Sequence, residues 1–171
     1  MSPVRPKEYL FDHLVVMGRD SLNELSELFQ DKGFHLTPLA HHNLGSSNRL
    51  IMLDSTYIEL LGWEKGKQIQ RAEIASQAIG LDALVFRTND AQACYEQLKA
   101  SGFAVNPVQD LSREGEFMGN TVLVEFKNAN ALGVAFGGEG GYVDGVASVR
   151  LAFAQPGPGL AHRDLAQVAR L

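Results

Sequence analysis

The sequence is poor in several features that would each indicate a class of protein. Cys94 is its one cysteine, so the chain cannot form an internal disulfide, and a reducing cytoplasm is the expected compartment. No apolar run approaches the ~20 residues of a membrane span, and we expect no secretion signal at the N-terminus. The formal net charge is -5 without a long basic run, which argues against nucleic acid and anionic membranes as partners.

Familiar signatures of catalysis and nucleotide binding are also missing. The chain contains no serine-histidine-acid order, no phosphate-cradling loop and no dinucleotide fingerprint. What remains is an ordinary globular composition, with 45% hydrophobic and 20% charged residues in a chain of 171. This length fits one domain or two small repeated units.

The most informative stretch runs from residue 42 to residue 61. Leu50 to Leu53 is a short apolar run, Asp54-Ser55 is a turn pair, and Thr56 to Leu61 is a return strand. Because side chains alternate faces along a strand, Tyr57, Glu59 and Leu61 share one face, and Ile58 and Leu60 share the other. Glu59 therefore needs a cation, a metal or water if its face is buried, or else it lies in solvent on an edge strand.

The chain contains an internal repeat of about seventy residues. Leu81 to Phe86 resembles Phe11 to Val16, and Gly102 to Pro107 resembles Gly33 to Pro38. In each copy a strand is followed by a capped amphipathic helix, with Ser21 and Glu24 predicting a capping box for the first. The order predicts two units of strand, helix and three strands, which is an α+β fold.

The repeat divides the chain into four segments. They are a first βαβββ unit at 10–63, a connecting segment at 64–79, a second βαβββ unit at 80–137, and a glycine-rich tail at 138–171. Strands are expected at Phe34 to Pro38 in the first unit and at Thr121 to Lys127 and Leu132 to Phe136 in the second. The tail carries a partial third echo, with a strand from Ala147 to Leu151 and a helix from His162 to Leu171.

Short motifs and their order resemble the glyoxalase-like domain family of the vicinal oxygen chelate superfamily. They are Asp12-His13, His42, Gly45-Ser46-Ser47-Asn48 and Tyr57-Ile58-Glu59-Leu60, and the resemblance covers residues 10 to about 137. It implies tandem units whose mixed sheets curl around a common cleft, and a divalent metal or small ligand held there. It also implies that His13 and Glu59 are metal ligands, and neutral imidazole and carboxylate suit zinc, iron, nickel or manganese.

The second unit departs from the family pattern. Ala83 occupies the position that corresponds to His13, and Val134 or Ala135 occupies the position that corresponds to Glu59. A metal site would therefore consist of His13 and Glu59, with or without His42, completed by water, substrate or another chain. This gap and the incomplete third echo lead us to expect a homodimer.

Four further residues are candidate substrate-binding residues, each with a plainer alternative. His42 faces the cleft, or it is an exposed loop residue like His41. Asn48 bonds a polar ligand, or it only shapes the turn. Arg87 pairs with Glu59 or an anionic substrate, or it is a solvated strand end. Trp63 walls the cleft, or it covers the end of the sheet.

Two classes of function follow. One is a metal-dependent lyase, isomerase or dioxygenase, in which the ion polarises vicinal oxygens and Glu59 or a bound water moves a proton. The other is a metal-free protein that binds or sequesters a small organic molecule, as bleomycin-resistance proteins do. The substrate is not encoded in these motifs, since one fold serves many chemistries.

Overall fold

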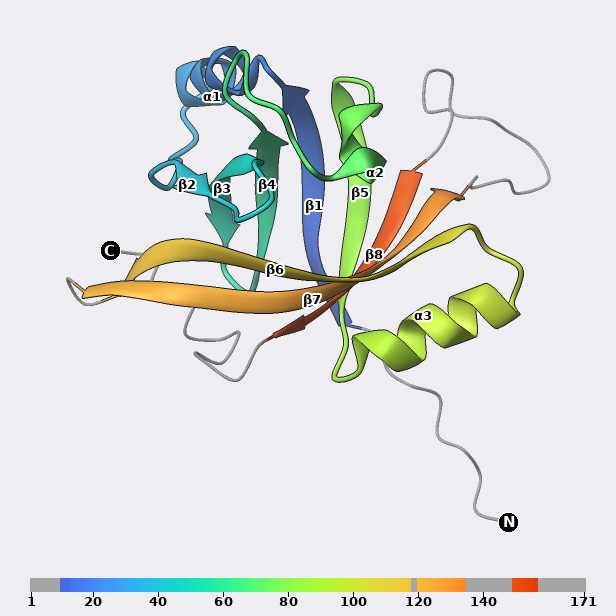
Figure 1. The fold of residues 1–171 in the computed structure, drawn as a ribbon. Coiled ribbons are helices and arrows are strands. Elements are labelled where there is room, and N and C mark those ends of the chain that lie inside the picture. The colour runs from blue at the N-terminus through green and yellow to red at the C-terminus, as the bar shows by residue number, and fades with distance from the viewer. Residues whose placement is uncertain (1–9, 118–119, 135–148, 157–171) are drawn as a thin grey trace.

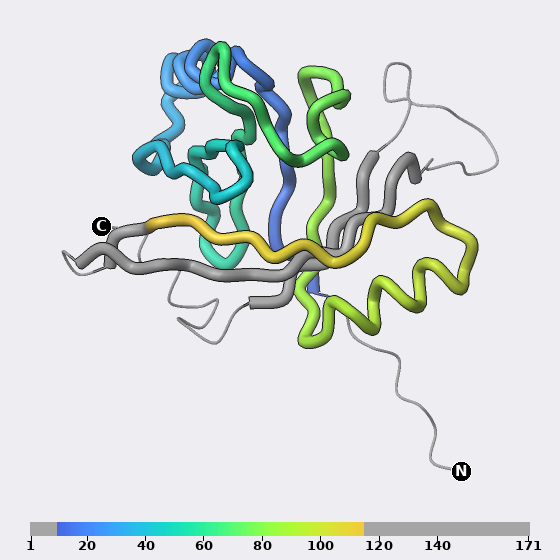
Figure 2. Tube along the Cα trace, viewed as in Figure 1, coloured from blue at the N-terminus to red at the C-terminus, as the bar shows by residue number. Residues whose placement is uncertain are grey.

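The computed structural model describes residues 10–117, 120–134 and 149–156 (Figure 1). It describes side chains for residues 10–114, the coloured part of the trace in Figure 2. The first half of the chain contains β1 (Leu10–Arg19), α1 (Leu22–Asp31), β2 (Ala40–His41), β3 (Ser47–Leu53) and β4 (Thr56–Gly62). A short helix, α2 (Ala72–Ala75), links it to the second half. There the elements are β5 (Gly80–Arg87), α3 (Ala91–Ala100), β6 (Val105–Phe117), β7 (Asn120–Val134) and β8 (Val149–Pro156).

All eight strands form one mixed sheet with the order β2-β3-β4-β1-β5-β8-β7-β6. In each half the first strand pairs in parallel with the fourth, which gives the β1–β4 and β5–β8 pairs. The two halves join where β1 and β5 pair antiparallel. The two halves therefore have the same topology, which confirms the α+β fold of tandem βαβββ units with curled mixed sheets.

Strand β8 was interpreted from the sequence as the start of a third unit. It instead lies between β5 and β7, and it occupies in the second half the place that β4 has in the first. The second half therefore extends to Pro156, beyond the boundary expected at residue 137. The two strands expected at 121–127 and 132–136 are one strand, β7, and the helix expected at 162–171 lies outside the described residues.

The helix ends and one strand also differ from expectation. Asp90 caps α3 as expected, since its side chain accepts a hydrogen bond from the backbone N–H of Ala93. Ser21 makes no such side-chain bond at the start of α1, so the predicted capping box is wrong. Residues 34–38 do not form a strand. In this segment only Thr37 forms hydrogen bonds with β3, and its backbone N–H donates to the carbonyl of Leu50.

The alternation along β1 and β4 divides the first half into two faces. On the outer face α1 packs over a cluster of Leu22, Ile51 and Leu60, with Val16, Leu25, Phe29 and Ile58 around it. The opposite, inner face holds a second cluster of Val15, Met17, Leu61, Trp63, Ile74, Ala83 and Val85. Burial of these apolar side chains is the main stabilising contribution to the sheet. A third cluster around Cys94 and Phe86 packs α3 against β5 and β6.

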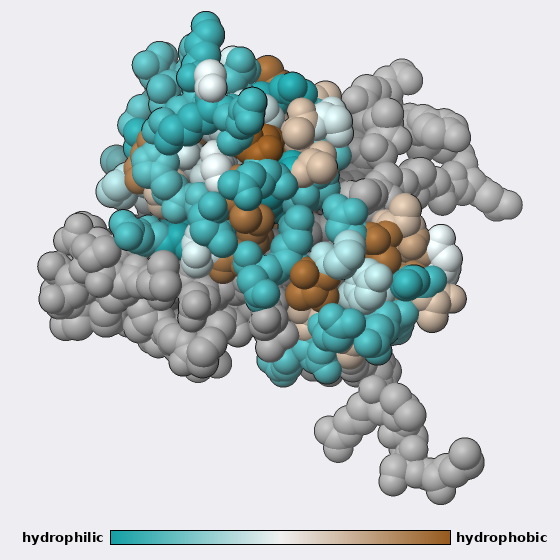
Figure 3. Space-filling model, in the orientation of Figure 1, coloured by the Kyte–Doolittle hydropathy of each residue, from teal (hydrophilic) through white to brown (hydrophobic). Residues whose placement is uncertain are grey.

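The sheet curls until its two edge strands approach each other. The long β6–β7 ribbon passes in front of the first half, with α1 and α3 at opposite corners of the view (Figure 1). At one point the edges meet in an isolated backbone bridge between His42 and Arg113. In the same view, polar side chains cover most of the first half and apolar ones lie in small groups (Figure 3). The two edge strands therefore meet at a seam beside His42 and Arg113.

None of the helices in the described part of the chain combines the length and the apolar character that a membrane span requires.

Candidate functional site

The imidazole of His13 lies between two carboxylates on the inner face. Its Nδ1 is 2.7 Å from Asp12 Oδ2, and its Nε2 is 3.4 Å from Glu59 Oε2. Burial alone lowers the pKa of His13, but the hydrogen bonds and negative charges of the two carboxylates outweigh burial and raise it. His13 therefore favours the charged imidazolium form.

Asp12 is fully buried beside His13. On a regular strand Asp12 and His13 would point to opposite faces, but the pairing of β1 with β5 shifts register between Phe11 and His13. This irregularity lets adjacent side chains bond each other. Asp12 also accepts a 2.6 Å bond from Arg87 Nε, so one buried carboxylate holds two cationic groups.

Glu59 lies on an inner strand and not at a solvent-exposed edge. Its side chain is 12% exposed, and β4 lies between β3 and β1. Burial by itself raises the pKa of Glu59. The hydrogen bond to His13, the charge of His13 and a 2.7 Å bond from Asn48 Nδ2 hold it below its ordinary value instead. Glu59 is therefore ionised and acts as a hydrogen-bond acceptor at neutral pH.

Arg87 meets Asp12 where the sequence suggested a pairing with Glu59. Its Nε donates to Asp12, and its Nη2 donates to the carbonyl of Ser55 over 2.8 Å. Both bonds tie β5 to the first half of the chain. Arg87 thus acts on the cluster indirectly, because it orients Asp12, which in turn orients His13.

Tyr57 completes the inner face of β4. Its ring stacks on the His13 imidazole, with centroids 4.3 Å apart and the planes 13° from parallel. Burial, together with the negative charges of Asp12 and Glu59, raises the pKa of Tyr57 well above its ordinary value. Tyr57 therefore keeps a neutral hydroxyl beside the imidazolium.

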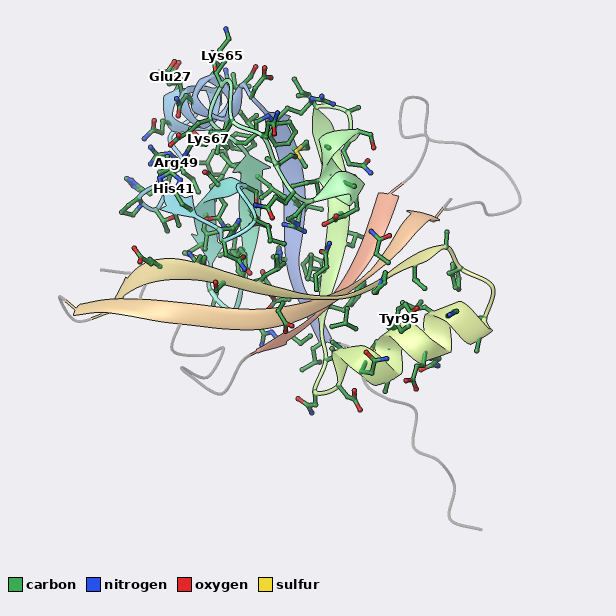
Figure 4. The ribbon with its side chains drawn as sticks, in the orientation of Figure 1. Glu27, His41, Arg49, Lys65, Lys67 and Tyr95 are labelled. Carbon is green, nitrogen blue, oxygen red and sulfur yellow. The ribbon has the colours of Figure 1, made fainter. Side chains whose placement is uncertain are left out.

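His42 lies at the inner face, while its neighbour His41 lies outside. The His42 side chain is buried, and its Nδ1 is 2.8 Å from Ser46 Oγ. Burial lowers the pKa of His42 to about 4, and the nearby cations Arg71 and Arg113 act in the same direction. His42 is thus a neutral imidazole at pH 7. His41, labelled in Figure 4, is exposed and reaches Glu64 at 3.7 Å.

The loop that carries His42 is clamped on two sides. Gly45 has a φ of +87°, and a Cβ there would come within 2.9 Å of the Gln68 carbonyl oxygen, so only glycine fits. The carbonyl of Leu44 accepts a 3.0 Å bond from Gln70. On the other side Asn43 bonds the backbone of β6 at Ser112, once as donor and once as acceptor. The 42–46 loop is therefore held against both the linker and the second half.

Asn48 lies on β3, next to Glu59 of β4, and is 3% exposed. Its amide nitrogen donates to Glu59, which fixes the amide oxygen as the remaining acceptor. Among the side chains that the structure describes, none donates a hydrogen bond to this Oδ1 atom. A buried acceptor without a donor costs about 1–3 kcal/mol, so this atom is a natural contact for a ligand.

Trp63 does not join this polar cluster. It directly follows β4, four residues after Glu59, and packs with Val15, Met17 and Ile74 in the inner-face core. The Arg19 guanidinium lies 5.5 Å from its ring. The structure therefore places Trp63 at the apolar end of the inner face, where α2 covers it.

The side chains of residues 10–114 do not by themselves make up a complete metal centre. His13 and Glu59 point at each other, and no group of three or more histidine, cysteine, aspartate or glutamate side chains in residues 10–114 is arranged around one point. The strand register makes Ala152 the counterpart of Glu59, because Val85 pairs with Ala152 as Val15 pairs with Glu59. The sequence interpretation assigned that place to Val134 or Ala135, which is wrong.

Sequence reasoning gave no role in the site to Asp12, Tyr57 or Arg113. Tyr57 could have been found, because the alternation that places Glu59 on the inner face places Tyr57 there too. Arg113 could not, since it belongs to β6 of the second half and reaches His42 only through the curl of the whole sheet.

Comparison with known proteins supports the fold and the family. Residues 11–138 match the glyoxalase-like domain family. No match was found among curated proteins. A hypothetical protein from Staphylococcus aureus superposes with a TM-score of 0.63 at 19% identity, over 94% of this chain and 63% of its own. This chain thus spans less than two thirds of that protein.

Two further solved structures are similar at low identity. A hypothetical protein from Bacillus halodurans has a TM-score of 0.54 at 11% identity, over 91% of this chain and 99% of its own. Methylmalonyl-CoA epimerase from Mycobacterium tuberculosis has a TM-score of 0.49 at 16% identity, over 86% of this chain and 88% of its own. The family match covers well over half of the sequence, and the tandem βαβββ sheet agrees with it. The chain belongs to the glyoxalase-like domain family.

Proposed function

We propose that this protein binds a small organic molecule at the polar end of the inner face, around His13, Asn48 and Glu59. The observation that carries the proposal is Asn48 Oδ1, a buried acceptor to which no described residue donates, on the side chain whose amide nitrogen bonds Glu59. A ligand hydroxyl or amine would satisfy this atom and remove its desolvation cost.

The charges of the cluster favour binding over proton abstraction by Glu59. Its lowered pKa makes Glu59 a weak base, although it accepts hydrogen bonds well. His13, held by Asp12 and stacked on Tyr57, is an oriented donor. Catalysis by Glu59 stays a prediction, and the fixed donors and acceptors support the sequestering or binding role more directly.

A metal-dependent reaction stays the second candidate. It is favoured by the 3.4 Å approach of His13 Nε2 to Glu59 Oε2, the two positions that the family resemblance assigns to ligands. Elemental analysis of protein purified without chelator tests it. If the two residues bind an ion, His13→Ala and Glu59→Gln each lower its content sharply. Unchanged content in both variants would remove them as ligands.

The binding proposal is tested by NMR with a library of small molecules, following the side-chain amide of Asn48 and the ring of His13. We expect hits that shift both signals and bind about tenfold or more weakly to Asn48→Leu, which lacks both polar atoms. The matched control is Asn23→Leu on the exposed face of α1, which should bind like the wild type. A library without a hit at Asn48 would contradict the proposal.

A homodimer is likewise proposed and not yet supported by the fold. One of its grounds, the incomplete third unit, is removed because β8 completes the second half. Sedimentation that gives only an 18.6 kDa species would end the proposal.

A further inference from the structure

Arg113 brings a positive charge from the second half to the site of the first. It lies on β6 and is half-buried, and its backbone bridges His42 across the seam between the two edge strands. Residues paired in an antiparallel bridge project to the same side of a sheet, so Arg113 and His42 share a face. The charge of Arg113 reaches both His42 and Tyr57.

No acid neutralises this guanidinium among the side chains that the structure describes. The described ion pairs assign Asp12 to His13 and Arg87, Glu59 to His13, and Glu73 to Arg71. The two residues that pair with Arg113 along the strands are His42 and, in β7, Val124. A half-buried cation beside neutral groups attracts an anion, and the planar guanidinium matches an oxyanion with two parallel hydrogen bonds.

The position of Arg113 is fixed by its neighbours. Asn43 and Ser112 bond each other in both directions, at 3.0 Å and 3.1 Å, directly beside the His42–Arg113 bridge. Gln109, further along β6, donates to the buried Glu73 of α2. These bonds hold β6 against the first half, so the backbone of Arg113 is preorganised and binding does not require ordering of the strand.

We propose that Arg113 is the specificity residue of the site and selects a small molecule that carries an oxyanion together with a hydroxyl or amine. The oxyanion meets Arg113 across the seam, and the hydroxyl or amine donates to Asn48 Oδ1. The inference rests on the proposed function and names its ligand class. It also gives the second half a role in the site, although that half has alanine at both expected ligand positions.

Three probes with one carbon skeleton test the proposal on the full chain. Glycerate carries a carboxylate, glycerol 3-phosphate carries a phosphate, and glycerol carries neither. Dissociation constants are measured by NMR titration at the Asn48 amide for the wild type, Arg113→Gln, Arg113→Lys and Lys99→Gln. Lys99 is exposed on α3 and lies 5.7 Å from the ring of Tyr95. Tyr95 lies away from the first half (Figure 4), so the Lys99 variant removes one charge without touching the site.

We expect at least one of the two anions to bind the wild type and to lose about tenfold or more in Arg113→Gln. Arg113→Lys keeps the charge but loses the two parallel N–H donors of the guanidinium, so its affinity for the anions should lie between those of the wild type and Arg113→Gln. The affinity of Lys99→Gln should match that of the wild type. The tighter of the two anions identifies carboxylate or phosphate as the preferred group.

Equal anion affinity in wild type and Arg113→Gln would overturn the proposal, and so would glycerol binding as tightly as the anions. Either result leaves the proposed function standing, because the molecule still binds at Asn48. Library hits that include none of these anions overturn the oxyanion class in the same way. A library without any hit at Asn48 contradicts the proposed function itself.

Discussion

At the scale of single residues, the polar cluster depends on Asp12. This carboxylate is fully buried and joins His13 to Arg87 through bonds of 2.7 Å and 2.6 Å. Charge-assisted bonds are the strong ones, and breaking a buried pair leaves a charge without its partner. Asp12 thus links the two halves electrostatically at the site.

Replacing Asp12 by asparagine should lower the free energy of unfolding by about 2–4 kcal/mol. The effect is smaller than for a fully buried ion pair, because solvent screens the partly exposed Arg87. The measurement is chemical denaturation at neutral pH. Asp31→Asn, at the exposed end of α1, removes the same charge and should change stability by about 0.5 kcal/mol or less. Equal small effects in both variants would mean that the Asp12 network contributes little.

His42 gives the protein a defined dependence on acidity. Burial holds its pKa at about 4 in the folded chain, below the ~6.5 of an unfolded one. As pH falls below ~6.5 the unfolded chain takes up a proton at His42 that the folded chain does not, so stability is lost down to pH 4. This loss is at most about 3 kcal/mol.

In His42→Gln this contribution disappears, so the difference in unfolding free energy between wild type and variant should change between pH 6.5 and pH 4 and be constant above. Denaturant titrations across that range measure it. An NMR titration of the His42 ring with a midpoint near pH 6.5 would contradict the assignment.

The sequence predicts part of this cluster and not the rest. Alternation along β4 placed Glu59 on a shared inner face with Tyr57, and the repeat identified the first strand that carries His13. The bond between Asp12 and Arg87 was not predicted, because the register shift in β1 turns inward the Asp12 side chain, which strict alternation would turn outward. A local irregularity of this kind leaves no signal in the pattern of apolar residues.

At the scale of elements, the loop of residues 42–46 decides how the site is built. It lies between the linker, through Gly45 and Gln68, and β6, through Asn43 and Ser112. Its geometry therefore sets where His42 lies relative to Glu59.

Comparing Gly45→Ala with Gly33→Ala separates the cost of backbone strain from the cost of a steric clash with the new Cβ. Both glycines have φ near +87°, and alanine there costs about 1–2 kcal/mol in each. Only at Gly45 would the new Cβ meet another atom, the Gln68 carbonyl oxygen, while nothing lies within 4 Å of Gly33. Gly45→Ala should be less stable than Gly33→Ala by about 1–3 kcal/mol in thermal or denaturant unfolding. Equal losses would show that the loop yields freely.

The elements themselves follow from periodicity to differing degrees. Both long helices and the β3–β4 hairpin agree with the spacing of apolar and turn residues. The strand expected at residues 34–38 is wrong, since one pair of bonds at Thr37 is too little to form a ladder. The capping box failed because the Ser21 side chain makes no bond to the helix. Sequence spacing alone does not fix either geometry.

At the scale of the whole molecule, the two halves form one continuous sheet. The internal repeat predicted the paired units, but the place of β8 could not be read from it, because residues 149–151 also resemble the start of another unit. The approach of β6 to His42 was equally hidden, since it depends on the accumulated twist and curl of eight strands. Arg113 therefore enters the site only once the structure is known.

A chain that ends at residue 137 should not fold cooperatively. It lacks β8, which pairs with both β5 and β7, and would expose two unpaired strand edges in the middle of the sheet. Far-UV circular dichroism with urea titration measures this against the full chain. A cooperative transition with the same midpoint would support the boundary that the sequence suggested.

The central claim is that a small molecule binds on the inner face beside His13 and Tyr57. Intermolecular nuclear Overhauser effects between a bound library hit and the protein test it most directly. We predict cross-peaks from ligand protons to the stacked rings of His13 and Tyr57, lost in Asn48→Leu. Cross-peaks confined to the outer surface, at the exposed Leu28 and Phe34, would contradict the account.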